Sequence, residues 1–314
     1  MKMTFLACLM AGVMAVPALA ADYTIMAPAG PGGGWDQTAR TMQEVMQAEG
    51  ISGNVQVQNV PGAGGTVGLA QFASSAAGDP SQLIVGGYVM VGAILTNASP
   101  VSLADVTPIA RLTGEYEAIV VPAASPIMSI AELVDALKAD PGAVSWAGGS
   151  AGGADHITVG LLAKAAGVDP TKINYIAYSG GGEALAAILG NQVTAGVSSL
   201  GEFLPQVQAG TMRLLAVTSD ARIDGVDAPT LVESGLDVVL QNWRMVAAAP
   251  GLDDAQKAAI AADIEKLNAS AGWNAALATK GWANTYLAGA DFDAQLARDI
   301  ETTGGILKDI GLVK

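Results

Sequence analysis

Cysteine and histidine are almost absent from this chain of 314 residues, which contains one of each, Cys8 and His156. A single cysteine forms no disulfide within the chain, and Cys8 lies inside the leader predicted below. Zinc sites take three or four ligands from Cys, His and acidic side chains, so neither a metal site nor a cofactor is expected. The composition thus argues against cysteine enzymes and histidine-rich metalloenzymes.

Positive charge and aromatic side chains are also scarce. The sequence has 15 Lys and Arg against 29 Asp and Glu, a formal net charge of −14, and 5% aromatic residues. Nucleic-acid-binding proteins need a basic surface and often aromatic platforms for the bases. No nucleic-acid partner is therefore expected. Nucleotide binding is not expected either, because the glycine turns lack the Gly-x-Gly-x-x-Gly spacing and no Gly-Lys-Ser/Thr occurs.

Long apolar runs are confined to the beginning of the chain. Residues 1–20 start with Lys2, continue with an apolar stretch and end in Ala18-Leu19-Ala20, which is typical of a secretory signal. We expect cleavage after Ala20 and a periplasmic mature protein, with an uncleaved membrane anchor as the alternative. A second apolar run, Leu83–Leu95, contains three glycines and is too short to cross a bilayer.

The rest of the chain alternates short β-rich runs with amphipathic helical stretches, which predicts an α/β protein with mostly parallel sheets. Two extended stretches, Glu115–Val121 and Val238–Ala248, have no short helix-forming turn beside them. We interpret them as crossover strands between two lobes. The predicted division is residues 21–121 with 243–314 in one lobe and 122–242 in the other.

Several predicted strands are followed by a glycine-rich turn and the start of a helix. Glycines let the backbone approach a ligand closely, and helix N-termini offer free N–H groups with a partial positive charge. Such turns gather at the carboxyl ends of the strands in open α/β sheets, which predicts an anion site. Between Glu49 and Asp105 the only charged residue is Asp79. We expect a cleft for carboxylates to carry few carboxylates of its own.

Four segments resemble the receptors of tripartite tricarboxylate transporters, the Bug receptors. In chain order they are Pro28–Asp36 (Pro-Ala-Gly-Pro-Gly-Gly-Gly-Trp-Asp), Asn59–Thr66 (Asn-Val-Pro-Gly-Ala-Gly-Gly-Thr), Tyr178–Leu185 (Tyr-Ser-Gly-Gly-Gly-Glu-Ala-Leu) and Pro229–Gly235 (Pro-Thr-Leu-Val-Glu-Ser-Gly). Each motif alone is weak, but their order extends over essentially the whole mature chain. The Gly-Gly-Gly-Trp-Asp version is most similar to the tricarboxylate-type receptors.

The resemblance implies a two-lobe periplasmic-binding-protein fold of type II-like form, hinged on the two crossover strands. It implies a monomer that closes on a small carboxylate and delivers it to the membrane permease subunits of the transporter. It also implies a set of ligand-binding residues. On the first lobe these are Pro31, Gly32, Gly33, Gly34, Trp35, Asp36, Gly64, Gly65, Thr66, Tyr88 and Val89. On the second lobe they are Ser150, Gly152, Gly153, Tyr178, Gly180, Gly181 and Ser198.

Some of these residues have a structural interpretation beside the functional one. Asp36 starts a helix and is interpreted mainly as a turn organiser that pairs with Arg40. Trp35 and Tyr88 either cover the ligand or belong to the core. His156 is expected to have a packing or capping role. Arg244 either reaches the cleft as a cation or, as we prefer, forms a structural salt bridge.

Three functions are compatible with these patterns. The main hypothesis is a solute receptor for a tricarboxylate such as citrate, or for a dicarboxylate, with no catalytic residue. The alternatives are a secreted α/β enzyme acting on a small anion, using Asp155 with His156 or Asp36, and a periplasmic sensor subunit. An aspartate at Gly65 is expected to abolish ligand binding by like-charge repulsion.

Overall fold

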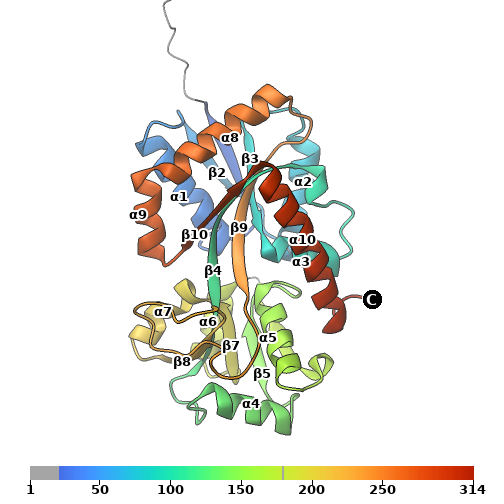
Figure 1. Cartoon of the computed structure of the whole chain (residues 1–314), viewed down its shortest axis with the longest axis vertical. Coiled ribbons are helices and arrows are strands. Elements are labelled where there is room, and N and C mark those ends of the chain that lie inside the picture. The colour runs from blue at the N-terminus through green and yellow to red at the C-terminus, as the bar shows by residue number, and fades with distance from the viewer. Residues whose placement is uncertain (1–20, 179) are drawn as a thin grey trace, which may run out of the picture.

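The computed structural model describes residues 21–178 and 180–314, which form two lobes joined by long strands (Figure 1). The predicted secretory signal lies outside the described residues. No helix in the described part of the chain is long and apolar enough to cross a membrane.

The upper lobe of Figure 1 is built on three parallel strands in the order β2-β1-β3. They are β1 (Tyr23–Ala27), β2 (Val55–Asn59) and β3 (Gln82–Gly87). Each strand leads through a glycine turn into a helix: α1 (Gly34–Ala48), α2 (Thr66–Ser75) and α3 (Tyr88–Thr96). This lobe also contains β9 (Gln241–Ala248), α8 (Asp254–Ala269), α9 (Ala271–Lys280), β10 (Ala283–Ala288) and α10 (Gly289–Asp309).

The lower lobe repeats the alternation with a second set of parallel strands, in the order β7-β5-β6. The strands are β5 (Ser145–Gly148), β6 (Asn174–Ala177), β7 (Ala195–Ser199) and β8 (Met212–Val217). The helices are α4 (Ile130–Ala139), α5 (Ala154–Ala165), α6 (Gly181–Leu189) and α7 (Leu200–Gln208). As a result, the glycine turns after β5 and β6 and the end of β7 face the corresponding turns of the upper lobe.

One strand, β4 (Thr107–Pro122), belongs to both lobes. Its first half pairs antiparallel with β9 and β10, and its second half pairs antiparallel with β7 and β8. The exchange of partners falls between Tyr116, opposite Gln241, and Glu117, opposite Ser199. The exchange lies five residues before the predicted crossing at 121/122, and the division into lobes itself stays a proposal. The sheets are mixed rather than mostly parallel, because the strands at the junction all pair antiparallel.

The lobes have separate cores but also touch on the side of α10. Trp273, Phe72 and Phe292 are buried in the upper core, and Trp146 and Leu133 in the lower. The C-terminal helix α10 runs from the upper lobe toward α5 of the lower lobe (Figure 1). Its last turns pack there against the start of α5, and Lys164 of α5 forms an ion pair with Asp309. The lobes are therefore linked outside the long strands as well.

Candidate ligand-binding site

A cavity of about 320 Å³ lies between the two lobes. The upper lobe contributes the turns after β1 and β2 and the start of α3. The lower lobe contributes the turns after β5 and β6, the end of β7 and the start of α7, and β9 adds Asn242 and Arg244. The volume lies within the range of cavities that bind small molecules. The carboxyl ends of the strands therefore meet at this cavity, as expected for an open α/β sheet.

Six helices begin at the cavity, and their N-termini share one feature. None of α1, α2, α3, α5, α6 and α7 has a hydrogen bond from its N-terminal N–H groups to the side chain of its capping residue. The capping residue is glycine in five of them and Ser199 in α7. Of the helices that begin away from the cavity, α4, α8 and α9 are capped by Ser129, Asp253 and Ser270, whereas α10 follows Ala288 and has no side-chain cap. Uncapped N–H groups are available to a bound anion.

Of the residues that the resemblance implied, eleven line the cavity: Gly33, Gly34, Trp35, Gly64, Gly65, Val89, Ser150, Gly153, Gly180, Gly181 and Ser198. Seven do not: Pro31, Gly32, Asp36, Thr66, Tyr88, Gly152 and Tyr178. Pro31 and Gly32 are exposed at the tip of the first turn, and Thr66 donates a hydrogen bond to the carbonyl of Ala63 at 2.9 Å. The structure thus brings together part of both predicted walls.

Asp36 holds the first turn together instead of facing the cavity. Its carboxylate accepts hydrogen bonds from the Gly32 N–H at 2.7 Å, from Asn59 Nδ2 at 2.8 Å and from Arg40 Nε at 2.9 Å. Burial alone would raise the pKa of Asp36, but these hydrogen bonds lower it. The interpretation of Asp36 as a turn organiser paired with Arg40 is confirmed.

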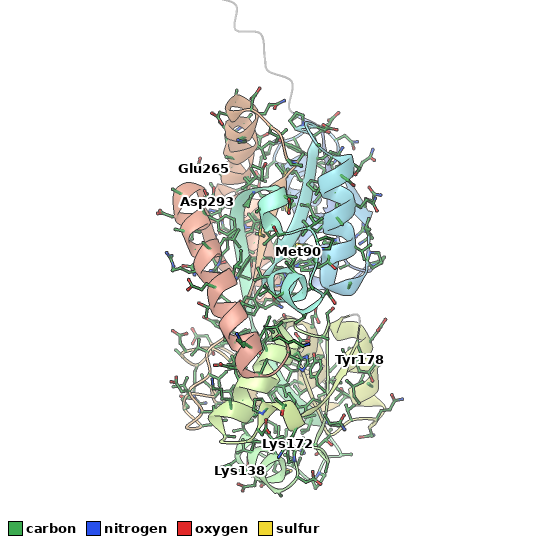
Figure 2. All side chains as sticks on the ribbon, turned by 90° about the vertical axis from the view of Figure 1, so that its right-hand side faces the viewer. Met90, Lys138, Lys172, Tyr178, Glu265 and Asp293 are labelled. Carbon is green, nitrogen blue, oxygen red and sulfur yellow. The ribbon has the colours of Figure 1, made fainter. Side chains whose placement is uncertain are left out.

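Tyr88, Gly152 and Tyr178 are structural for three different reasons. Tyr88 is buried beside Trp243, with ring centroids 6.3 Å apart. Gly152 has φ +76° and packs under Thr96 of α3. Tyr178, labelled on the lower lobe in Figure 2, packs against the core beneath α6 and α7. Trp35 differs from these three, because it is buried and also lines the cavity.

Arg244 combines both roles considered for it. It is 3% exposed, forms a buried ion pair with Glu115 of β4, and its guanidinium lies 4.7 Å from the centroid of the Trp282 ring. It also lines the cavity and touches the first turn, since a Cβ at Gly34 would lie 2.6 Å from Arg244 Nη2. Among the described lining residues it is the one cation.

The expectation that the cleft carries few carboxylates of its own is wrong for the lower lobe. Asp155 and Glu202 line the cavity, and Glu115 and Glu117 of β4 are buried close behind them. Asp155 Oδ2 accepts a hydrogen bond from the Gly149 N–H at 2.6 Å, and Glu202 Oε2 accepts one from Ser198 at 2.8 Å. The stretch between Glu49 and Asp105, in which Asp79 is the only charged residue, contributes to the upper wall alone.

Burial and repulsion from neighbouring carboxylates raise the pKa of Asp155, Glu117 and Glu115. Burial is the main cause for Asp155, whose pKa rises to about 7, and the Glu202 carboxylate adds to it. Burial also raises the pKa of Glu117 well above its usual range, and both of its carboxyl oxygens lack a hydrogen-bond partner. The pKa of Glu115 is raised by burial, against the effect of Arg244. The lower wall therefore holds one carboxyl group, Asp155, that is readily protonated near neutral pH, with the buried Glu115 and Glu117 behind it.

His156 has a packing role, as predicted. Its ring stacks on Tyr175 with centroids 4.0 Å apart, and its Nδ1 accepts a hydrogen bond from the Gly152 N–H at 3.3 Å. Burial lowers its pKa to about 4, so the ring is neutral. His156 is absent from the cavity lining. No group of three or more His, Cys, Asp or Glu is arranged to hold a metal ion within residues 21–178 and 180–314.

The ligand-binding residues that the resemblance implied omit twelve lining residues, although Arg244 was considered as a cation reaching the cleft and Asp155 as a candidate acid or base. Seven are neighbours of predicted turn positions: Pro28, Ala29, Gly30, Pro61, Gly62, Ala63 and Gly149. Five are polar or charged: Asp155, Ser199, Glu202, Asn242 and Arg244. For the first set, extending each turn back to the end of its strand would have sufficed. For Glu202, the signal was its place four residues after Ser198, in the first turn of a helix that follows a strand.

Comparison with known proteins agrees with this architecture. The family model described as "Tripartite tricarboxylate transporter family receptor" matches residues 38–312. Protein BugT of Bordetella pertussis is 30% identical over 234 residues, which cover 73% of this chain and 71% of BugT. The structure is also similar to two solved ones from Rhodopseudomonas palustris. Rpa4515 with adipate has 20% identity, a TM-score of 0.83 and coverage of 93% of this chain and 97% of that one.

MatC with bound malate has 22% identity, a TM-score of 0.77 and coverage of 95% and 100%. At these identities the two structures show the fold, which is the two-lobe α/β fold of periplasmic binding proteins. The fold class implied by the sequence resemblance is confirmed.

Proposed function

This chain belongs to the tripartite tricarboxylate transporter receptor family, and on that premise we propose that it captures a small organic carboxylate between its lobes and delivers it to the transporter's membrane permease. The family consists of binding proteins, not enzymes. The proposed ligand is a dicarboxylate or a tricarboxylate such as citrate. The ligands of Rpa4515 and MatC, adipate and malate, support this class.

The observation that carries the proposal is the set of six uncapped helix N-termini around the cavity. Each N-terminus stabilises a nearby anion by about 0.3–1 kcal/mol, so the six together contribute about 2–6 kcal/mol. Micromolar binding corresponds to about 8 kcal/mol. Hydrogen bonds from the Ser199 hydroxyl, the Asn242 amide and the Arg244 guanidinium are the source we propose for the remainder.

The proposed capture mechanism is rotation of one lobe about the strands that join them. β4 exchanges its partners between Tyr116 and Glu117, and Asn242 of β9 donates a hydrogen bond to Ser199 of β7 at 3.3 Å. A hinge at this level moves the lower wall toward the upper one with the cores intact. The ligand first contacts the glycine turns of the upper lobe, and the lower lobe then covers it.

The chain is proposed to act in the periplasm after removal of residues 1–20, and as a monomer. Mass spectrometry of the protein secreted from its host tests the first statement, with an N-terminus at Ala21 expected. Size-exclusion chromatography with light scattering tests the second.

A thermal-shift screen followed by calorimetry tests the function itself. Residues 21–314, refolded to remove bound ligand, are exposed to citrate, malate, adipate and an uncharged diol of the length of adipate. A ligand that binds only the folded state raises the melting temperature. We expect a shift with at least one acid, none with the diol, and one-site binding. The control is Asp169→Asn, an exposed turn residue that does not line the cavity. No shift with any acid would reject the proposed function.

A further inference from the structure

The lower wall of the cavity gathers more negative charge than a receptor for anions can hold in ionised form. The Glu202 carboxylate of α7 lies close enough to raise the pKa of Asp155 of α5 and of Glu115 and Glu117 of β4. Arg244 pairs with Glu115. Among the described residues, no Lys or Arg forms an ion pair with the other three. Four ionised carboxylates and one guanidinium would give the cluster a charge of −3.

A dianion such as malate would enter beside this charge in a cavity from which water is largely displaced. Repulsion between like charges is strong at low local dielectric constant. Asp155 and Glu202 also lie in the first turns of α5 and α7, where helix dipoles favour ionised carboxylates. The helix dipoles alone would explain Asp155 and Glu202 as ordinary residues of a first helical turn. They do not explain Glu117, which is fully buried in the middle of β4.

Protons are the counter-charge that fits the geometry. Glu117 is 0% exposed and neither carboxyl oxygen has a hydrogen-bond partner, which is the environment of a neutral carboxylic acid. The Asp155 carboxylate accepts hydrogen bonds from the Gly149 N–H and from its own backbone N–H, and Glu202 accepts one from Ser198. Each carboxyl group keeps a lone pair that can carry a proton. The described cluster lacks the arrangement of three ligands that a metal ion would need.

The groups facing Asp155 leave few other sources of charge compensation. They are Glu115 and Glu117 from β4, Tyr175 from β6, Glu202 from α7, and the neutral ring of His156 on its own helix. Glu183, in the first turn of α6, is the ionisable residue of that helix. Arg244 from β9 acts mainly on Glu115, and α3 brings no Asp, Glu, Lys or Arg to the cavity. Most groups near Asp155 are therefore acids or neutral.

From this arrangement we infer that Asp155 and Glu202 bind the ligand as neutral carboxylic acids that donate hydrogen bonds to it, so that the receptor takes up protons when it captures an anionic carboxylate. The inference rests on the proposed carboxylate-binding function. It distinguishes two halves of the site: the upper wall binds one carboxylate through N–H groups, and the lower wall binds the other end through O–H groups. The bound complex consequently carries less negative charge than its separate components.

A ligand with an ammonium group is the competing occupant. It would be held by ionised Asp155 and Glu202, and its affinity would rise with pH as the acids ionise. Proton-coupled binding of a dicarboxylate has the opposite sign, because the acids must be protonated. The direction of the pH dependence therefore separates the two.

The first experiment titrates the protein with malate and with adipate by calorimetry between about pH 6 and about pH 9. Both acids are fully ionised over most of this range, since ordinary carboxyls have pKa values near 4. Each pH is measured in two buffers of different ionisation enthalpy, which gives the number of protons taken up. We expect uptake near pH 7 and an affinity that weakens up to about tenfold per pH unit above it, for each proton bound. Binding without proton uptake, or affinity that rises with pH, would overturn the inference.

The second experiment uses Asp155→Asn and Glu202→Gln, which keep the shape and a hydrogen-bond donor but cannot ionise. Each variant is expected to bind malate or adipate at least as well as wild type at about pH 8, with a shallower pH dependence. Asp169→Asn, on the surface of the same lobe, is the matched control and keeps the wild-type slope. Loss of binding in a variant that melts like wild type, or an unchanged slope in both variants, would contradict the inference.

Aspartate completes the set as a probe, because it differs from malate by an ammonium in place of a hydroxyl. Tighter binding of aspartate than of malate, lost in Asp155→Asn, would assign ionised acids to the lower wall and reject proton uptake. If malate, adipate, citrate and aspartate all fail to bind at any pH, the proposed function itself fails. Binding without proton uptake rejects the inference alone.

Discussion

The two walls of the cavity are built by the same device, a strand, a turn and an uncapped helix, yet they differ in charge. The upper wall consists of glycine, proline and alanine turn residues with Trp35 and Val89, and none of its described lining residues is acidic. The lower wall carries Asp155 and Glu202, with Glu117 behind them. The same backbone arrangement therefore serves two kinds of contact. Backbone N–H groups alone face the ligand above, and side-chain oxygens join them below.

Arg244 and Glu115 stand between these walls, at the level where the lobes join. Replacing Arg244 by Met should have the largest effect, because it removes the cation from the cavity and leaves Glu115 buried without a partner. Breaking a buried ion pair costs about 3–5 kcal/mol. We expect a lower urea midpoint and loss of malate, adipate or citrate binding. The double variant Arg244→Met with Glu115→Gln should regain stability but not binding. Equal stability of the single and double variants would contradict this role.

The pH dependence of the free energy of unfolding tests the protonation of the lower wall. The pKa of Asp155 is raised from 3.8 to about 7, so between these values the folded state binds more protons than the unfolded state. The free energy of unfolding should fall as pH rises through this window, by up to about 1.4 kcal/mol per pH unit. His156 has the opposite sign, because its pKa is lowered from 6.5 to about 4 and stability rises with pH there.

The two slopes partly cancel between about pH 4 and about pH 6.5, so the difference between wild type and Asp155→Asn is the quantity to measure. Urea unfolding at a series of pH values gives both curves. We expect the variant to gain stability relative to wild type as pH rises toward 7, with no further gain above it. Parallel curves would show that Asp155 titrates in the same way in both states.

Adding a carboxylate to the upper wall should reduce the charge difference between the walls and weaken ligand binding. Gly65 is unsuitable for this, because its φ is +90° and a Cβ would lie 2.6 Å from the Trp35 ring. Ala29 lines the cavity and already has a side chain. Ala29→Asp should weaken binding of a dicarboxylate by about 2 kcal/mol, or roughly thirtyfold, at a separation of ~8 Å. The isosteric Ala29→Asn should weaken it much less, and calorimetry that finds equal losses would assign the effect to size.

The smallest effect is expected where the walls touch beside the cavity. A Cβ at Gly92 of α3 would overlap the carbonyl oxygen of Gly152, so this glycine allows the lobes to approach. Gly92→Ala should weaken carboxylate binding by about 1 kcal/mol or slightly more, mainly through faster dissociation. The control is Gly305→Ala in α10, where a Cβ meets open space and a small gain in stability is expected. Stopped-flow dissociation rates that are equal in the two variants would argue against the Gly92–Gly152 contact.

The alternation of strands and helices could be predicted because most elements carry their own local pattern, such as the apolar residues of β1 and β8 and the alternating valines of β2. The two predicted crossover strands have other bounds in the structure: β4 begins at Thr107, eight residues before Glu115, and β9 begins at Gln241, three residues after Val238. Strand β10 carries no such pattern. β10 is partly exposed and is stabilised by antiparallel pairing with β4, a partner far away in sequence. That pairing leaves no local periodicity to detect.

The candidate site also has a part that the sequence predicts and a part that it does not. Glycine turns after strands are visible in the sequence because left-handed and closely approached backbone positions require glycine, as at Gly64 and Gly65. The acids of the lower wall were not visible as a group. Glu117, Asp155 and Glu202 lie in three elements, and each alone is an ordinary residue of a strand or a first helical turn.

The sequence by itself determined the alternation of strands and helices, the glycine turns and the resemblance to one receptor family, because these depend on residues close together in the chain. The tertiary structure alone decided where β4 exchanges its partners and that Arg244 lies against both Glu115 and the first turn. It also decided that four carboxyls meet at one wall. Electrostatic coupling depends on distance and burial, and both are set only when strands far apart in the sequence pair.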